Sequence, residues 1–322
     1  MKAAVEKTGT KGGRKGKKRA VALAQAKLKT QLAQQSHGKR FVMEKLIGSG
    51  GMCEVYIALD LQRLAWSDRA PRVALKRLLP KLAVNKQAQL ALAQEFFILR
   101  NIAHEGIVRA YDLHEEEWGP CYSMELLEGA TLYQKQGKAH SGFGRDGLDM
   151  AARVFGSLAY LHERGVIHGD MKPANIFLAA DKRVVLFDFS VSQVEVSPGK
   201  SSASIKQGLR EPLKLQAHSP LHASPERIIS GRPSFPDDIY SACCTMYECI
   251  EGTHPFQRRT AGEAMELGLK PAKPKTLSLL QWSVLSRGLS FEPEQRPKAD
   301  QLFAAFSELK VFSRLLTKFQ VT

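Results

Sequence analysis

Hydrophobic and polar residues form short, regular patterns only after about residue 40. Three runs of aliphatic and β-branched residues follow one another, each bounded by turn residues: FVMEKLIGS from Phe41, CEVYIALD from Cys53 and RVALKRLL from Arg72. Runs of this length and composition predict β-strands. Two further runs of the same kind lie near residues 107–113 and 120–127. The first third of the chain is therefore predicted to be rich in strands.

Helical spacing of apolar residues begins within this region and dominates the second half. Residues 82–102 are predicted to form a helix whose apolar spacing passes through Leu90, Phe97 and Ile98. The segment GLDMAARVFGSLAYLHERG predicts an amphipathic helix that stops at Gly165. From Asp237 onward three segments have helical patterns: DDIYSACCTMYECIEG, LSLLQWSVLSRGL and KADQLFAAFSELKVFSRLLTKF. Strands first and helices afterwards predict an α+β fold in two parts.

Charge separates the beginning of the chain from the rest. The 322 residues carry a net charge of +15, and residues 1–40 alone hold 12 Lys or Arg against the single acid Glu6. Residues 1–38 are expected to be a basic, disordered tail, because their Gly- and Lys-rich start cannot bury enough apolar surface to order itself. Such a tail suits acidic partners or anionic surfaces. No aromatic residues interleave its charges, so we expect no specific nucleic-acid binding.

The apolar runs and the cysteines bear on location. No run reaches the 18 to 20 residues that a transmembrane helix needs, and no secretory signal is recognisable at the N-terminus. The five cysteines show no metal-binding spacing. Four of them, Cys121, Cys243, Cys244 and Cys249, are expected to be small buried residues. We therefore expect a reduced, cytoplasmic protein without a transmembrane segment.

A glycine-rich turn and a lysine lie in the strand-rich region. Gly48, Gly50 and Gly51 separate two predicted strands, so backbone N–H groups there are accessible to phosphate oxygens. Lys76 lies on the third predicted strand, and a lysine on a buried strand requires an anion. A nucleotide phosphate is one candidate, and the carboxylate of Glu95 on the predicted helix is the other.

The stretch VIHGDMKPANIFLAADKRVVLFDFS, residues 166–190, brings several polar residues together. Asp170 can accept a proton, and Lys172 can neutralise a moving phosphoryl group. Asn175 and Asp188 provide oxygen atoms of the kind that Mg²⁺ prefers, from the two ends of a predicted β-hairpin. These residue types at these spacings point to phosphoryl transfer assisted by a divalent cation.

These motifs together resemble the signature set of the bacterial eukaryotic-like (Hanks-type) Ser/Thr protein kinases. The resemblance runs from about residue 41 to residue 309. It implies a bilobal, protein-kinase-like fold, with a small β-rich N-lobe at 39–128 and a larger helical C-lobe at 129–322. The activation segment of such a kinase would span 188–226. The implied activity is transfer of the γ-phosphoryl group of ATP to Ser or Thr hydroxyls of proteins.

The resemblance also implies roles for single residues. Asp170 and Lys172 would be catalytic, Lys76 would pair with Glu95, and Asn175 and Asp188 would bind Mg²⁺, with Mn²⁺ as an alternative. The residues implied to contact ATP are Gly48, Ser49, Gly50, Gly51, Val55, Ala74, Lys76, Met124, Glu125, Leu127 and Phe177. The resemblance further implies a structural ion pair between Glu226 and Arg296, and a bracing contact from Asp238 to the catalytic loop.

The sequence departs from the family pattern at three positions. Cys53 replaces the third glycine of the loop, and Ser190 follows Asp188-Phe189 where the family has glycine. Gly169 replaces the arginine that usually precedes the catalytic aspartate and meets a phosphate on the activation segment. Its absence implies that phosphorylation of this segment is not a strict on-switch. Autophosphorylation is nevertheless expected at Ser197, Ser201, Ser202 and Ser204.

Two alternatives remain at this stage. A pseudokinase scaffold would be consistent with Cys53 and Ser190. A small-molecule phosphotransferase of the aminoglycoside or choline type would be consistent with the spelling His168-Gly169-Asp170. Ser219-Pro220 and the helix carrying Asp238 favour a protein substrate, because they resemble the platform on which protein kinases bind an extended polypeptide.

Overall fold

The computed structural model describes residues 40–137, 142–195 and 219–307. The predictions for the basic tail and for Ser197, Ser201, Ser202 and Ser204 lie outside these residues. The described chain divides after Lys76 into two compact units, residues up to 76 and residues from 77 onward. The lobe limits implied by the family resemblance stay a prediction.

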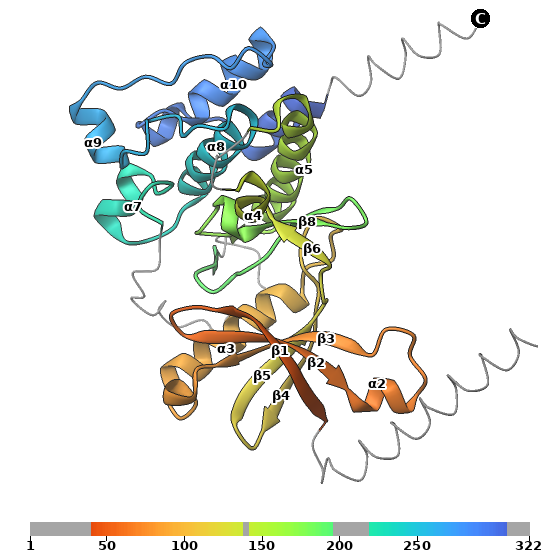
Figure 1. Cartoon of the computed structure of the whole chain (residues 1–322). Helices are drawn as coiled ribbons and strands as arrows, with labels where there is room; N and C mark the ends of the chain where they lie inside the picture. The colour runs from red at the N-terminus through yellow and green to blue at the C-terminus, as the bar shows by residue number, and fades with distance from the viewer. Residues whose placement is uncertain (1–39, 138–141, 196–218, 308–322) are drawn as a thin grey trace, which may run out of the picture. The chain divides into compact units, whose positions relative to one another are not determined.

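The first unit contains the first two predicted strands and most of the third. β1 (Phe41–Ser49) and β2 (Cys53–Asp60) pair antiparallel, and β3 (Arg72–Leu78) is the next strand of the same sheet (Figure 1). Both β1 and β2 have the bounds that their apolar runs predict. The short helix α2 (Leu61–Ala65) begins where Asp60 accepts hydrogen bonds from the backbone N–H groups of Gln62 and Arg63. A side-chain carboxylate at this position satisfies N–H groups that the helix leaves unpaired.

The second unit opens with α3 (Lys86–Arg100), which packs on the hairpin of β4 (Ala110–Glu116) and β5 (Gly119–Met124) (Figure 1). The predicted helix is confirmed, but part of its expected apolar face is wrong. Leu90 and Phe97 are 65% and 53% exposed. The buried face instead contains Leu92, Phe96 and the charged Glu95. The buried face of α3 includes the acid Glu95, and the spacing of apolar residues alone does not predict a buried acid.

Short strands carry the motif-rich stretch. β8 (Ile176–Ala179) pairs with β9 (Val184–Leu186) as a hairpin, which confirms the hairpin predicted there, and β6 (Gly129–Thr131) pairs with the other edge of β8. The remaining short elements of this region are α4 (Leu132–Gln136), β7 (Val166–Ile167), η2 (Pro173–Asn175) and β10 (Gln193–Val194). β7 and β10 pair antiparallel, so the stretch 166–190 contributes strands to two small sheets.

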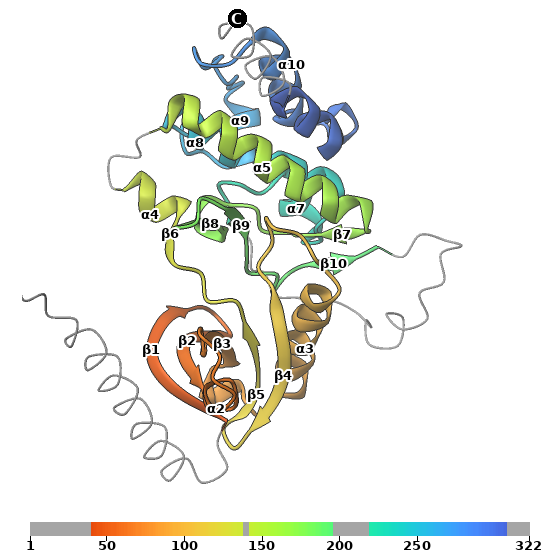
Figure 2. The same cartoon turned by 90° about the vertical axis from the view of Figure 1, so that its right-hand side faces the viewer.

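Helices make up the rest of the second unit. α5 (Gly144–Glu163) and α8 (Phe235–Glu251) lie side by side (Figure 2). α8 is buried along almost its whole length, and it includes the predicted buried residues Cys243, Cys244 and Cys249. The other helical elements are α7 (Pro225–Ser230), α9 (Ala261–Glu266), α10 (Leu279–Gly288), η3 (Pro293–Gln295) and a helix that is described over residues 299–307. Cys121 is also buried, and all five cysteines are free thiols.

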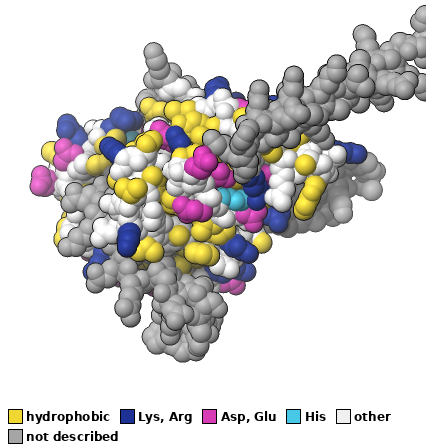
Figure 3. All heavy atoms as spheres, turned by 90° about the horizontal axis from the view of Figure 1, so that it is seen from below, with side chains coloured by type: hydrophobic (Ala, Val, Ile, Leu, Met, Phe, Trp, Pro, Cys, Tyr) yellow, Lys and Arg dark blue, Asp and Glu magenta, His cyan; other side chains and the backbone are white. Residues whose placement is uncertain are grey.

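The described surface is mixed in character. In the view of Figure 3, Lys and Arg side chains are interspersed with Asp, Glu and hydrophobic side chains. This agrees with a basic charge that resides mainly in residues 1–40. Within the described ranges, no helix has both the length and the apolar character required to cross a membrane.

Candidate active site

The side chain of Asp170 is held by two neighbours from its own loop. Lys172 Nζ donates to Asp170 Oδ2 at 2.6 Å, and Asn175 Nδ2 donates to the same oxygen at 2.9 Å. Asn175 Nδ2 also donates to the backbone carbonyl of Asp170 at 2.9 Å. Among the described residues, the hydrogen bonds to this carboxylate end on Oδ2. Oδ1 is thus left to accept a proton or a hydroxyl donor. The structure brings together three of the four residues predicted from the stretch 166–190.

Asp188 lies close to this cluster through the β8–β9 hairpin. Ile176 pairs with Leu186, and the backbone N–H of Phe187 donates to the carbonyl of Asn175 at 3.1 Å. Asn175 and Asp188 therefore emerge at the same end of the hairpin. Asp188 has a φ of +64°, a conformation that L-residues rarely adopt. Such backbone strain concentrates at functional sites, where surrounding contacts enforce it.

The segment after Asp188 is anchored to α3. The backbone N–H of Phe189 donates to Glu95 Oε1 at 3.1 Å, and Glu95 is 3% exposed. The ring of Phe189 lies 4.7 Å from the ring of His168, centroid to centroid. A carboxylate from a helix 94 residues away thus helps to fix the backbone that presents Asp188. The predicted pairing of Glu95 with Lys76 stays a prediction.

The loop that carries Asp170 is braced by the N-terminal part of α8, as the family resemblance implies for Asp238. Asp238 Oδ2 accepts the backbone N–H of His168 at 2.7 Å, and Oδ1 accepts that of Gly169 at 2.7 Å. His162 Nε2, on α5, lies 3.1 Å from Oδ2. Asp238 is 1% exposed. Charged acceptors of backbone N–H groups make strong hydrogen bonds. The bracing contact is confirmed.

The predicted ion pair between Glu226 and Arg296 is also confirmed. Arg296 makes a bidentate contact to the Glu226 carboxylate, with Nη2 3.0 Å from Oε2. Burial tends to raise the pKa of Glu226, but the Arg296 guanidinium outweighs it and holds the pKa below its usual value. Arg296 also donates to three backbone carbonyls, those of Pro236, Ser290 and Phe291. This arginine therefore ties α7 to the start of α8 and to the loop before residue 299.

The predicted glycine loop belongs to the first unit. The backbone N–H of Gly50 donates to the carbonyl of Cys53 at 2.9 Å, which closes the turn between β1 and β2. A Cβ built at Gly50 or Gly51 would meet no atom within 4 Å, while one at Gly48 would touch the side chain of Val55 at 3.7 Å. The loop is thus open, with Ser49 exposed. On β3, Ala74 and Lys76 are buried, at 3% and 6% exposure.

The other residues implied to contact ATP lie in the second unit. Met124 ends β5, Glu125 and Leu127 follow it, and Phe177 lies on β8; all four are half-buried. The carboxylate of Glu125 is engaged by Arg183 Nη2 at 2.5 Å. Their contact with a nucleotide stays a prediction.

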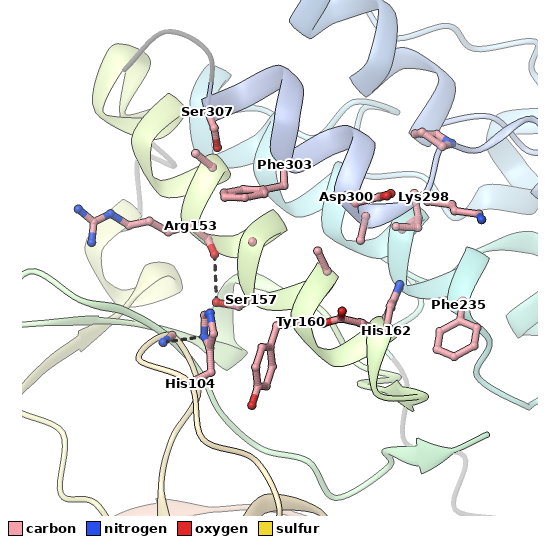
Figure 4. Close-up of a pocket in the computed structure, with 18 of the residues that line it drawn as sticks. His104, Arg153, Ser157, Tyr160, His162, Phe235, Lys298, Asp300, Phe303 and Ser307 are labelled. Atoms are coloured by element: carbon pink, nitrogen blue, oxygen red, sulfur yellow. Dashed lines mark hydrogen bonds between the residues drawn. The ribbon is translucent and has the colours of Figure 1, made fainter. Parts of the chain in front are cut away.

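A pocket of about 1300 Å³ has a lining that includes none of these four residues. It is lined by α5, by residues 299–307 and by the loop that carries His104, and Figure 4 shows Phe303 beside α5 at its centre. None of the four motif residues, Asp170, Lys172, Asn175 and Asp188, lines it. The chemistry of the side chains, and not the size of a cavity, therefore identifies the candidate active site.

Several residues that hold the site together were missed by sequence reasoning. Beyond His162, Ser192 Oγ donates to the carbonyl of His168 at 2.8 Å. The hydroxyl of Thr245 is shared between the carbonyl of Ser241, at 2.8 Å, and that of Met171, at 3.2 Å. Thr245 lies seven residues after Asp238, on the same helix. That spacing could have indicated a second contact from α8. The serine and the histidine carry no local signal, because their partners are distant in the sequence.

Comparison with known proteins assigns the family. Residues 41–306 match the protein kinase domain, so the chain belongs to the protein kinase family. It is 27% identical over 277 residues to the serine/threonine-protein kinase PkaA of Streptomyces coelicolor, covering 82% of this chain and 49% of that protein. It is 29% identical to pkn2 of Myxococcus xanthus, covering 85% and 33%, and 28% identical to PknB of Mycobacterium tuberculosis, covering 67% and 33%. The chain thus spans between a third and a half of the length of these three relatives.

Proposed function

We propose that this chain is an ATP-dependent protein kinase that transfers the γ-phosphoryl group to Ser or Thr hydroxyls of proteins. The observation that carries the proposal is the Asp170 cluster, in which Lys172 and Asn175 fix the carboxylate through one oxygen. The family match and the names of the relatives support the same conclusion.

In this mechanism the chain mainly orients groups and moves one proton. Asp170 Oδ1 accepts the proton of the substrate hydroxyl. At the same time the hydroxyl oxygen forms a bond to the γ-phosphorus of ATP, and the bond between that phosphorus and the β–γ bridging oxygen breaks. Lys172 Nζ, 2.6 Å from Asp170 Oδ2, neutralises the charge on the transferred group. Because both Lys172 and Asn175 fix Asp170, loss of either one also misplaces the base.

The described residues fit a divalent cation that arrives with a nucleotide. Asn175 uses its Nδ2 for both hydrogen bonds to Asp170, which leaves its side-chain oxygen for a metal. Asp188 adds a carboxylate at the same end of the hairpin. Within the described ranges, no three His, Cys, Asp or Glu side chains form a metal site of their own. Mg²⁺ typically takes one or two protein carboxylates and completes its shell with phosphate oxygens and water.

The test uses radiolabelled ATP, Mg²⁺ and two acceptor classes: a generic basic protein, and a mixture of aminoglycosides and choline. We expect label on the protein and on this chain itself, and we expect Asp170→Asn to lower the rate by about 1,000-fold, since it removes the proton acceptor. Asp146→Asn, an exposed acid on α5, is the matched control. Label on the small molecules alone would show the alternative phosphotransferase, and equal rates for wild type and Asp170→Asn would refute the assignment of the base.

Autophosphorylation and the basic tail concern residues outside the described ranges. Mass spectrometry after incubation with ATP and Mg²⁺ is expected to find phosphate on at least one of Ser197, Ser201, Ser202 and Ser204; unmodified serines would contradict this. We place the protein in the cytoplasm and assign residues 1–38 to acidic partners or anionic surfaces. Deletion of residues 1–38 should leave turnover of the basic protein intact but weaken binding to anionic vesicles, and a large loss of turnover would contradict this role.

A further inference from the structure

A buried arginine lies beside the catalytic loop, on an element other than the loop itself. Arg227 is the third residue of α7 and is 2% exposed. Its Nη1 donates to the carbonyl of Gly231 at 2.6 Å. Its Nε has no hydrogen-bond acceptor among the described residues, and it lies 3.9 Å from Asp237 Oδ2. Arginine is almost never fully buried without a charged partner, so the position of Asp237 explains the burial of Arg227.

Asp237 connects this arginine to the end of the activation segment. Its Oδ1 accepts the hydroxyl of Ser224 at 2.8 Å and the backbone N–H of Ser224 at 3.3 Å. Asp237 is 1% exposed and adjoins the loop-bracing Asp238. Burial raises the pKa of Asp237 to about 7, the charge of Asp238 acts in the same direction, and the Arg227 charge opposes both. Without Arg227, two adjacent buried carboxylates would lose a cation that stabilises them.

Both residues border the catalytic loop. Arg227 and Asp237 line a cavity of about 10 Å³ together with Gly169, Asp170 and Ser219. A space of this size holds at most about one water molecule, so a phosphate group cannot enter it. Arg227 therefore acts inside the fold and not as a receptor for a phosphorylated residue.

We propose that Arg227 and Asp237 are positioning residues that hold residues 219–224 against the catalytic loop in the absence of activation-segment phosphate. The proposal rests on the proposed kinase function and adds its regulation. Gly169 supplies no cation to the loop. Arg227, paired with Asp237 between α7 and α8, supplies a buried cation instead. Residues 219–224, the platform for the protein substrate, are thus held in place whether or not the activation segment is phosphorylated.

The first test compares wild type, Arg227→Met and the double variant Arg227→Met/Asp237→Asn. With a Ser-containing peptide, Arg227→Met should raise the peptide KM about tenfold and leave the ATP KM within about twofold, because the platform and not the nucleotide site is disturbed. The double variant should recover part of the loss, since it removes the uncompensated acid as well. Wild type pretreated with a protein phosphatase should keep at least about half of its activity.

Arg232→Met is the control, because Arg232 is exposed and lies five residues from Arg227. An unchanged peptide KM in Arg227→Met, a parallel rise of both KM values, or a loss of more than about half of the activity on phosphatase treatment of wild type would each overturn the proposal.

Hydrogen exchange of the full-length protein provides a second readout that needs no catalysis. Backbone amides within 219–231 should exchange faster in Arg227→Met and as in wild type in Arg232→Met, because the Ser224 N–H loses its fixed acceptor. Unchanged exchange in Arg227→Met would count against the pair. If wild type phosphorylates nothing above the rate of Asp170→Asn, the proposed function fails, and this exchange experiment still decides whether the pair holds residues 219–224.

Discussion

Replacing Asp238 by asparagine tests the bracing of the catalytic loop. The carboxylate accepts two buried backbone N–H groups at 2.7 Å, and an amide can accept only one of them while its own NH₂ faces the other. A buried donor without an acceptor costs about 1–3 kcal/mol, and a charge-assisted bond is lost as well. We therefore expect Asp238→Asn to lower the free energy of unfolding by about 3 kcal/mol.

For a domain of this size, such a loss lowers the melting temperature by about 6–12 °C. Because Asp170 directly follows Gly169, the displaced loop should also lower kcat at least about tenfold. Differential scanning calorimetry and peptide phosphorylation below the transition measure the two effects. The control is Asp300→Asn. Asp300 is exposed, and its Oδ1 accepts the N–H of the neighbouring Gln301. A melting temperature within about 2 °C of wild type together with an unchanged kcat would refute the reasoning.

Two further predictions concern ionisable groups of the second unit. Arg296→Met should lower the free energy of unfolding in urea by about 4 kcal/mol, because it leaves Glu226 and three carbonyls without their donor. Arg287 is exposed, so the control Arg287→Met should change this free energy little. Equal stability of the two variants would contradict the prediction. Burial lowers the pKa of His254 to about 4. As the pH falls, the imidazole is therefore protonated in the unfolded chain before it is protonated in the folded one. The free energy of unfolding should then fall by roughly 3 kcal/mol between about pH 6.5 and about pH 4. His254→Asn should flatten that part of the stability profile, and an unchanged slope would contradict the assignment.

The physical reason for the His254 prediction is visible in its contacts. Nε2 lies 2.8 Å from the carbonyl of Leu221, and Nδ1 accepts the backbone N–H of Phe256 at 3.2 Å. A second proton would replace this acceptor by a donor that faces another donor. The hydrogen bonds of His254 in the folded chain therefore favour its neutral imidazole.

The pattern of apolar residues and turn residues predicted the strands β1 and β2 and the presence of helix α3. β1 and β2 have the predicted bounds because each is a run of strand-forming residues limited by turn residues. The helix over α3 was predicted, but its orientation was not, since Glu95 occupies a buried position that an apolar pattern treats as exposed. The burial of this one acid is where the helix departs from its apolar pattern.

The residues of the candidate site fall into two groups. Asp170, Lys172 and Asn175 lie within six positions, so their spacing alone predicted a cluster. The supports of that cluster join residues that are far apart in the sequence, such as His162 to Asp238 across 76 positions. No spacing predicts such contacts, because they depend on how α5 and α8 pack. The family resemblance supplied the role of Asp238, whereas the histidine became visible only in the structure.

The backbone at Gly169 limits how this loop could be redesigned. Gly169 has a φ of +81°, and a Cβ there would approach the ring of Pro233 and the carbonyl of Val191 at 3.1 Å. A laboratory that wished to build a phosphate-gated version by the exchange Gly169→Arg would therefore meet steric resistance before any new regulation appeared. The nearest Pro233 atom is its Cβ, which every residue except glycine carries, and the Val191 contact is to the backbone, so the exchange would also require the surrounding backbone to shift.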